Sequence, residues 1–328
     1  MKFSKLTPLI GVAVFATIAL AGCTVPGQGG ATAQAVAKGS IKIGYSGATQ
    51  QSPFYVALGD AAQAQAAARG EKYYSADANG DVTKQNNDVQ DLITRGINVL
   101  IIDPVDPTGI TPALAAAKAA GIKVVTVDRP VTTGAVSFVG RDNKAMGKLV
   151  GQQAVKSLGT AGGKIIEIQG DAGGAVAKDR GDGFAEGVAS QSNISVVAGP
   201  YCNYVRSQAV TAMQNLLQAN PDVKAVYAEN DDMAMGALQV LQENNRTDVK
   251  VFGIDGLMQA VKSISTGDQY VATASNDPKT EGSLAVDTAI TVAQGKSVPT
   301  FVDAGTGLVT KSNAGSLVGS ATFAKAVK

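Results

Sequence analysis

The chain has 328 residues, and its 28 Lys and Arg residues nearly balance its 27 Asp and Glu residues. This length favours two domains with a core each, and the balanced charge leaves no basic surface for nucleic acid. The absence of histidine from the sequence excludes Ser-His-Asp and Cys-His catalysis and His-ligated metals. We therefore predict no nucleic-acid partner, no metal and no other cofactor.

The amino terminus has the pattern of a secretory signal. A basic start precedes an apolar segment, Leu6 to Leu20, that is short for a membrane span. The following Leu20-Ala21-Gly22-Cys23 resembles the lipobox of bacterial lipoproteins, whose cysteine receives lipid. An ordinary signal peptide with a chance cysteine is the alternative. We predict a lipoprotein signal peptide over 1–23, lipidation of Cys23, and a flexible, nearly uncharged tether over 24–39.

From Ser40 onward, short apolar runs alternate with longer helical patterns, as expected for βαβ units. In the first half we predict strands over 41–44, 72–75, 99–102 and 124–127, and helices over 53–69, 81–95 and 108–120. Ser52 and Pro53 are expected as the N-cap and first residue of the first helix. One doubly wound unit is complete at this point.

The same rhythm then restarts. Helices are predicted over 143–158, around Arg180 and Phe184, and over 207–219, 232–244, 257–265 and 278–294. Strands are predicted over 164–169, 195–198, 225–228, 250–253 and 270–275. The fold class is therefore α/β, with two similar doubly wound parallel-sheet domains.

Polar side chains follow several of the predicted strands. They are Asp103, Asp128, Arg129, Asn230, Asp255 and Asn276. Because parallel strands present their carboxyl ends to a ligand-binding crevice, these side chains should line a cleft between the domains. Carboxylates and amides suit the hydroxyls of a sugar or polyol, and aromatic faces suit its CH groups. Alternatives are a loop-closing ion pair at Asp128 and Arg129, or an amino-acid ligand.

Three other motifs have simpler interpretations. The Gly-rich segment 159–164 is one residue short of a phosphate loop and lacks its Ser or Thr, so a turn is expected. The segment 77–81 has calcium-like residue types in the wrong spacing and is expected to be a turn with a helix cap. Asp231 and Asp232 are expected to cap a helix rather than to act as a catalytic pair.

From Ser40 to about Thr310 the chain resembles the periplasmic sugar-binding proteins of ABC importers, in their ribose-binding branch. The resemblance rests on several segments in order. They include Pro53-Phe54-Tyr55, Val127-Asp128-Arg129, Asp179-Arg180-Gly181-Asp182-Gly183-Phe184, Glu229-Asn230-Asp231-Asp232-Met233-Ala234 and Gly253-Ile254-Asp255-Gly256. It implies a ligand shell formed by Ser52, Phe54, Tyr55, Asp128, Arg129, Arg180, Tyr204, Asn230, Asp255 and Asn276.

Three members of this shell depart from the ribose pattern. Ser52 stands for an asparagine, Tyr204 for a phenylalanine and Asn276 for a glutamine. A lost or displaced hydrogen bond in a dry pocket alters specificity by about 1–3 kcal/mol. The resemblance therefore implies a small polyhydroxylated ligand, with ribose or a similar pentose first among the candidates.

The resemblance also implies three hinge crossovers, near 141–143, 275–277 and 303–306. The expected domains are 40–142 plus 277–303 and 143–276 plus 304–328. We predict an extracytoplasmic, lipid-anchored, monomeric binding protein that closes on a monosaccharide and delivers it to an ABC permease, without catalytic activity. A repressor with this fold, a sugar enzyme, and a sugar receptor feeding a signalling partner are the alternatives.

Overall fold

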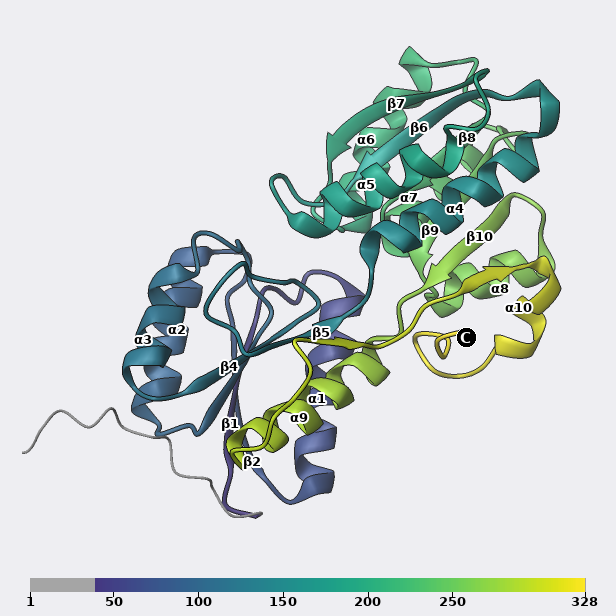
Figure 1. Cartoon of the computed structure of the whole chain (residues 1–328). Helices are drawn as coiled ribbons and strands as arrows, with labels where there is room; N and C mark the ends of the chain where they lie inside the picture. Colours follow the sequence, from purple (N-terminus) through teal and green to yellow (C-terminus); the bar gives the residue numbers. More distant parts are fainter. Residues whose placement is uncertain (1–38, 328) are drawn as a thin grey trace, which may run out of the picture. The chain divides into compact units, whose positions relative to one another are not determined.

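The structure, a computed structural model, describes residues 39–327, which form two six-stranded sheets with helices packed on them (Figure 1). The predicted signal peptide, the lipidation of Cys23 and all but the last residue of the predicted tether lie outside the described residues. Between residues 39 and 327, no helix combines the length and apolarity needed to cross a membrane.

The first sheet contains parallel strands only, in the order β11-β5-β4-β3-β1-β2. Its strands are β1 (Lys42–Gly47), β2 (Lys72–Asp77), β3 (Val99–Ile102), β4 (Lys123–Val127), β5 (Ser137–Gly140) and β11 (Phe301–Asp303). Its helices are α1 (Pro53–Arg69), α2 (Val82–Thr94), α3 (Thr111–Ala119) and α9 (Pro278–Ala293). We call this sheet with its helices the first lobe.

The second sheet has the order β12-β10-β9-β8-β6-β7, with β12 alone antiparallel to its neighbour among the described strands. Its strands are β6 (Gly163–Gln169), β7 (Ile194–Tyr201), β8 (Ala225–Ala228), β9 (Lys250–Asp255), β10 (Tyr270–Ser275) and β12 (Leu308–Thr310). Its helices are α4 (Asn143–Leu158), α5 (Ala175–Val188), α6 (Arg206–Ala219), α7 (Asp231–Glu243), α8 (Met258–Thr266) and α10 (Lys311–Leu317). This is the second lobe.

The central strands are buried on both faces. Every residue of β3 and of β8 is buried. Both strands are continuous apolar runs, because helices cover both faces of a parallel sheet and leave no solvent-facing side. The predicted α/β class with two doubly wound domains is confirmed.

Helix ends follow local sequence signals. Pro53 begins α1, and Gly70 ends it in the left-handed region at φ 76°, where glycine avoids a Cβ clash. Asp81 caps α2 by accepting hydrogen bonds from the backbone of Thr83 and Lys84. Ser52 precedes α1 as predicted, but its side chain makes no capping bond.

The chain passes between the sheets three times. It crosses at Arg141–Asp142 between β5 and α4, at Asn276–Asp277 between β10 and α9, and at residues 304–307 between β11 and β12. These segments agree with the predicted crossovers. The carboxyl ends of strands from both sheets therefore lie beside the same crossovers.

Some elements differ from the sequence predictions. Strands β5, β11 and β12 were missed, because three or four residues are too few to show a periodicity. Helix α10, which has seven residues, was missed as well. Helix α3 begins at Thr111 rather than Thr108, because the Asp106 side chain accepts hydrogen bonds from the backbone of Thr108 and Gly109 and holds a turn there. Beyond α10, Ala324 donates a backbone hydrogen bond to Gly256 and ties the carboxyl-terminal segment to the second lobe.

Candidate functional site

The predicted strand-end residues are buried at the carboxyl ends of their strands. Asp128 follows β4, Asn230 lies just after β8, Asp255 ends β9 and Asn276 follows β10. All four are at most 6% exposed. Asp128 and Asp255 have positive φ values of 61° and 128°, which cost energy in a residue with a Cβ. Such backbone strain at two buried carboxylates is typical of a functional site.

Asp128, Asn230 and Asp255 line one small pocket, whose empty space, counted together with the part open to solvent, is about 220 Å³. It is lined by Ser52, Phe54, Tyr55, Asp128, Val176, Arg180, Tyr204, Asn230 and Asp255. All but Val176 belong to the predicted shell, while Arg129 and Asn276 of that shell lie behind the lining. Both lobes contribute, since Ser52, Phe54, Tyr55 and Asp128 belong to the first and the others to the second.

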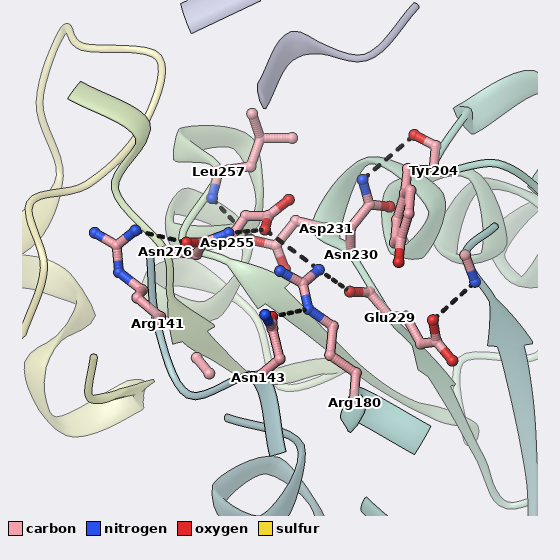
Figure 2. A network of polar contacts seen from close by, with 12 residues as sticks. Arg141, Asn143, Arg180, Tyr204, Glu229, Asn230, Asp231, Asp255, Leu257 and Asn276 are labelled. Carbon is pink, nitrogen blue, oxygen red and sulfur yellow. Dashed lines mark hydrogen bonds and ion pairs between the residues drawn. The ribbon is translucent and has the colours of Figure 1, made fainter. Parts of the chain in front are cut away.

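Arg180 is the central donor of the second lobe (Figure 2). Its Nε donates to Asn143 at 2.9 Å, and its Nη1 donates to the Glu229 carbonyl oxygen at 2.6 Å. Its guanidinium lies 3.7 Å from the Asp255 carboxylate and 5.8 Å from the centre of the Tyr204 ring. These contacts fix the guanidinium plane in the cavity wall.

Close packing of α4 against α5 positions Arg180. A Cβ at Gly147 of α4 would lie 2.1 Å from the Arg180 carbonyl oxygen, and one at Gly183 of α5 would lie 2.0 Å from the Lys144 carbonyl oxygen. The two backbones approach so closely that only glycine fits at these positions. The spacing of Gly147 and Gly151 on one helix matches that of Gly183 and Gly187 on the other.

Asn230 caps α7 and joins the cavity wall. Its Oδ1 accepts a hydrogen bond from the backbone of Met233 at 2.9 Å, and its Nδ2 donates to the Tyr204 carbonyl oxygen at 3.3 Å (Figure 2). The prediction that Asp231 and Asp232 cap this helix was wrong, because Asn230 occupies the cap and both aspartates lie in the first turn.

Asp231 instead has a structural role below the site. It is fully buried and accepts hydrogen bonds from the Tyr270 hydroxyl, the Thr273 hydroxyl and the Leu257 backbone at 2.6, 2.9 and 2.7 Å. Burial raises the pKa of the Asp231 carboxyl to about 7, and the hydrogen bonds oppose that rise. Asp231 thus ties α7 to β10 and to the start of α8; Figure 2 shows its bond with Leu257.

Arg129 lies among carboxylates of both lobes. It hydrogen-bonds the Tyr55 hydroxyl and the Pro104 carbonyl oxygen, the latter at 3.2 Å. Its guanidinium lies 3.8 Å from Asp103, 3.9 Å from Asp128 and 3.6 Å from Asp171. Asp171 belongs to the loop after β6, so the last of these pairs crosses from one lobe to the other.

Asp103 was found at a strand end but was not included in the predicted shell. Asp171 was missed, although it lies two residues beyond β6, as Asn230 does beyond β8, so the same strand-end signal could have found it. Burial raises the pKa of the Asp103 carboxyl, and the Arg129 guanidinium opposes that rise. Arg129 is thus the common partner of several acids, and its contact with a ligand stays a prediction.

Several buried polar atoms at the site have no hydrogen-bond partner among the described residues. They are the Ser52 and Tyr204 hydroxyl oxygens, Arg129 Nε and both carboxylate oxygens of Asp103. Buried polar groups are normally paired, and each unpaired one needs an explanation. The hydroxyls of Ser52 and Tyr204 line the cavity, where they are available to a small polar molecule.

The cavity is acidic but is not arranged for a metal. Burial raises the pKa of the Asp128 carboxyl, and the Arg129 and Arg180 guanidinium groups oppose that rise. Burial also raises the pKa of the Asp255 carboxyl, and Arg180 opposes that rise. Among residues 39–327 no group of three or more Asp, Glu or Cys side chains is arranged to hold a metal ion. Two carboxylates, an amide, a guanidinium and two hydroxyls instead provide hydrogen bonds of both directions.

The chain belongs to the periplasmic binding protein family, because the family model described as "Periplasmic binding protein domain" matches residues 43–297. It is 37% identical over 300 residues to the ribose import binding protein RbsB of Escherichia coli (strain K12), which covers 91% of this chain and 95% of that protein. The family resemblance deduced from the sequence is confirmed.

Two further relatives are informative. The xylitol-binding protein of Mycolicibacterium smegmatis (strain ATCC 700084 / mc(2)155) is 32% identical over 68% of this chain and 64% of that protein. The crystal structure of an ABC transporter solute binding protein from Mycobacterium smegmatis, with bound glycerol, is 73% identical and has a TM-score of 0.86. The match covers 87% of this chain and 99% of that chain.

Family membership defines a binding component of transport outside the cytoplasm, not an enzyme. This agrees with the prediction that no residue is catalytic.

Proposed function

We propose that this protein is the solute-binding component of an ABC importer and binds a monosaccharide or polyol in the cavity between its lobes. Ribose or a similar pentose is the first candidate, and a hexose or an open-chain polyol is the second. The observation that carries the proposal is the cavity lining itself. Buried Asp128, Arg180, Asn230 and Asp255 supply hydrogen-bonding groups from both lobes, with Phe54 at their edge.

The lining fits hydroxyl groups and CH faces together. Carboxylates accept from hydroxyls, and guanidinium and amide groups donate to them. The Phe54 and Tyr55 rings both line the cavity and meet edge to face with centroids 5.6 Å apart, and aromatic rings suit the apolar side of a sugar. The ribose, xylitol and glycerol named for the relatives are all polyhydroxylated and uncharged.

We propose that ligand binding closes the lobes by rotation at the three crossovers. Two contacts between the lobes support this. The Arg129 and Asp171 side chains approach to 3.6 Å, and the Phe54 and Phe323 rings meet edge to face with centroids 6.1 Å apart. Neither contact can survive if the lobes separate, so both favour the closed form.

Asp171→Asn is expected to weaken sugar affinity up to about fivefold, because a partly exposed ion pair that forms on closure contributes up to about 1 kcal/mol. The loss should shrink at high salt, which screens the pair. Calorimetric titration at low and high salt measures both effects. Asp222→Asn removes an ion pair within the second lobe and should leave affinity unchanged, and equal affinity for both variants would contradict the cross-lobe role.

We further propose that the domains comprise 40–142 plus 277–303 and 143–276 plus 304–328, with the monomeric chain tethered through lipid on Cys23 to the cell membrane, near its permease. The lipobox-like sequence supports the anchor. The grouping of the strands into two sheets supports these domain bounds.

Cys23→Ala is expected to abolish incorporation of radiolabelled palmitate and to release the protein from the membrane fraction, because the thiol is the proposed acceptor of lipid. Cys202→Ala is the matched control, since Cys202 is buried in the second lobe and should leave labelling unchanged. Labelling that persists in Cys23→Ala would contradict the anchor.

A thermal-shift screen over pentoses, hexoses and polyols tests the proposed function. A ligand at a hundredfold excess over its dissociation constant adds about 2.7 kcal/mol to the free energy of unfolding, which raises the melting temperature by several degrees. D-Gluconate, compared with D-glucitol, is a matched negative control, because its carboxylate would meet Asp128 and Asp255. The absence of a shift with every neutral sugar and polyol would contradict the proposal.

A further inference from the structure

One buried guanidinium joins all three crossovers. Arg141 lies on the first crossover, and its Nε donates to the Gly305 carbonyl oxygen of the third at 2.6 Å. Its Nη2 donates to the Asp277 carbonyl oxygen of the second at 3.0 Å. Its Nη1 donates to the Asn276 side chain, also on the second, at 2.7 Å. The first crossover is more than a hundred residues from the other two along the chain, and Arg141 holds all three at one point.

A buried acid compensates the charge of Arg141. The Glu281 carboxylate, in the first turn of α9, forms an ion pair with the same Nη1, and both side chains are 1% exposed. Burial raises the pKa of Glu281 to about 8, and Arg141 opposes this rise. Removing one member of such a pair leaves an unpaired buried charge, whereas replacing both by apolar residues is often tolerated.

Arg141 also fixes the orientation of the Asn276 amide. A guanidinium can only donate hydrogen bonds and an ionised carboxylate can only accept them. Asn276 therefore turns its Oδ1 toward Arg141 and its Nδ2 toward Asp255, which accepts at 3.1 Å (Figure 2). Asp255 in turn lies 3.7 Å from Arg180. A continuous polar chain thus runs from the crossovers to two residues of the cavity lining.

We propose that Arg141 is a positioning residue of the binding site, which sets the direction of the Asn276 amide and so orients Asp255 toward the ligand. Its action on ligand affinity rests on the proposed function, whereas its action on Asn276 does not. Arg141 lies on a predicted crossover, but no sequence pattern selected it for a role at the site, because charged residues in connecting segments are usually solvated.

The first test needs no ligand. In 15N-labelled protein, the side-chain Nδ2 cross-peaks of Asn276 are assigned by their disappearance in Asn276→Leu. The double variant Arg141→Met, Glu281→Leu leaves no unpaired charge in the buried site, so the protein should stay folded. A melting curve checks that it does. We expect a shift or loss of the Asn276 cross-peaks in this variant. Unchanged cross-peaks and unchanged solvent exchange would overturn the proposal.

The second test is calorimetric titration with the sugar or polyol that gives the largest thermal shift. The double variant is expected to lose about tenfold in affinity, the effect of one displaced hydrogen bond in a buried site. Adding Asn276→Leu to it should cost little more, because Arg141 acts through Asn276. Full additivity, or unchanged affinity of the double variant, would overturn the positioning role.

Arg246→Met is the matched control. Arg246 also donates to two carbonyl oxygens, of Pro221 and Val223, and pairs with Asp248, but it does so within the second lobe only. Arg246→Met should lower thermal stability but leave the Asn276 cross-peaks and the ligand affinity unchanged. A loss of affinity equal to that of the double variant would overturn the specific role of Arg141. If the wild-type protein binds no sugar, the proposed function fails, while the Asn276 cross-peaks still decide whether Arg141 orients this amide.

Discussion

Asp128→Ala is expected to abolish measurable sugar binding, with a loss of affinity of about a hundredfold or more. Hydrogen bonds to a charged group contribute about 1.5–3 kcal/mol each, and a carboxylate in the lining can accept two from neighbouring hydroxyls. Asp128 lines the cavity and is 6% exposed. Calorimetric titration of the ligand found by thermal shift measures the loss.

Two further variants distinguish the loss of the Asp128 carboxylate from the effect of strain in its backbone. Asp128 has φ 61°, and asparagine tolerates this conformation better than alanine. Asp128→Asn should therefore keep the fold and still lose affinity, because its amide replaces an acceptor by a donor. As a control, Asp268→Ala should leave sugar affinity unchanged, because the Asp268 side chain is 90% exposed on the second lobe. Wild-type affinity in Asp128→Asn and Asp128→Ala would refute the assignment of this carboxylate.

Gly147→Val is expected to lower the free energy of unfolding by about 3 kcal/mol or more, at the upper end of the range for overpacking. A Cβ at this position would lie 2.1 Å from the Arg180 carbonyl oxygen and 2.9 Å from the Phe184 nitrogen. Helices α4 and α5 would have to separate. Urea denaturation measures the loss, and because the shift also displaces Arg180, sugar affinity should fall in the variant that remains folded.

Gly315→Ala is the control for this substitution. Gly315 lies in α10, and a Cβ there would meet no atom within 4 Å, so alanine should be neutral or stabilise the helix by up to about 1 kcal/mol. Equal stability of Gly147→Val and the wild type would show that α4 and α5 do not pack as closely as described.

The fold was largely predictable because its central strands carry strong local signals. Runs such as Val99–Ile102 and Ala225–Ala228 are apolar throughout, and the helices between them are long enough to show their boundaries. The edge strands β11 and β12 are three residues long. Their pairing depends on the crossovers, which bring distant segments together. A contact of this kind cannot be predicted from a local sequence pattern.

The site was predictable to the extent that it follows strand ends. Asp128, Asn230 and Asp255 lie in the cavity lining as expected. Arg129 was expected to bind ligand, and that contact stays a prediction; in the structure its partners are Tyr55 and the carboxylates around it. The pairing of Asp171 with Arg129 could not be foreseen, because it depends on how the lobes meet.

Asn276 was expected in the ligand shell and instead lies behind the lining, between Arg141 and Asp255. Its ligand contact therefore stays a prediction. Sequence reasoning placed it correctly at the end of a strand but could not predict the partner that orients it, since Arg141 is 135 residues away along the chain.

The most direct test of the central claim is a crystal structure of the protein with the best ligand of the thermal-shift screen. We predict the sugar or polyol in the cavity, with its hydroxyl oxygens within hydrogen-bond distance of Asp128 in the first lobe and of Arg180 and Asn230 in the second. A ligand bound elsewhere, or one held by a single lobe with the cavity empty, would contradict this account.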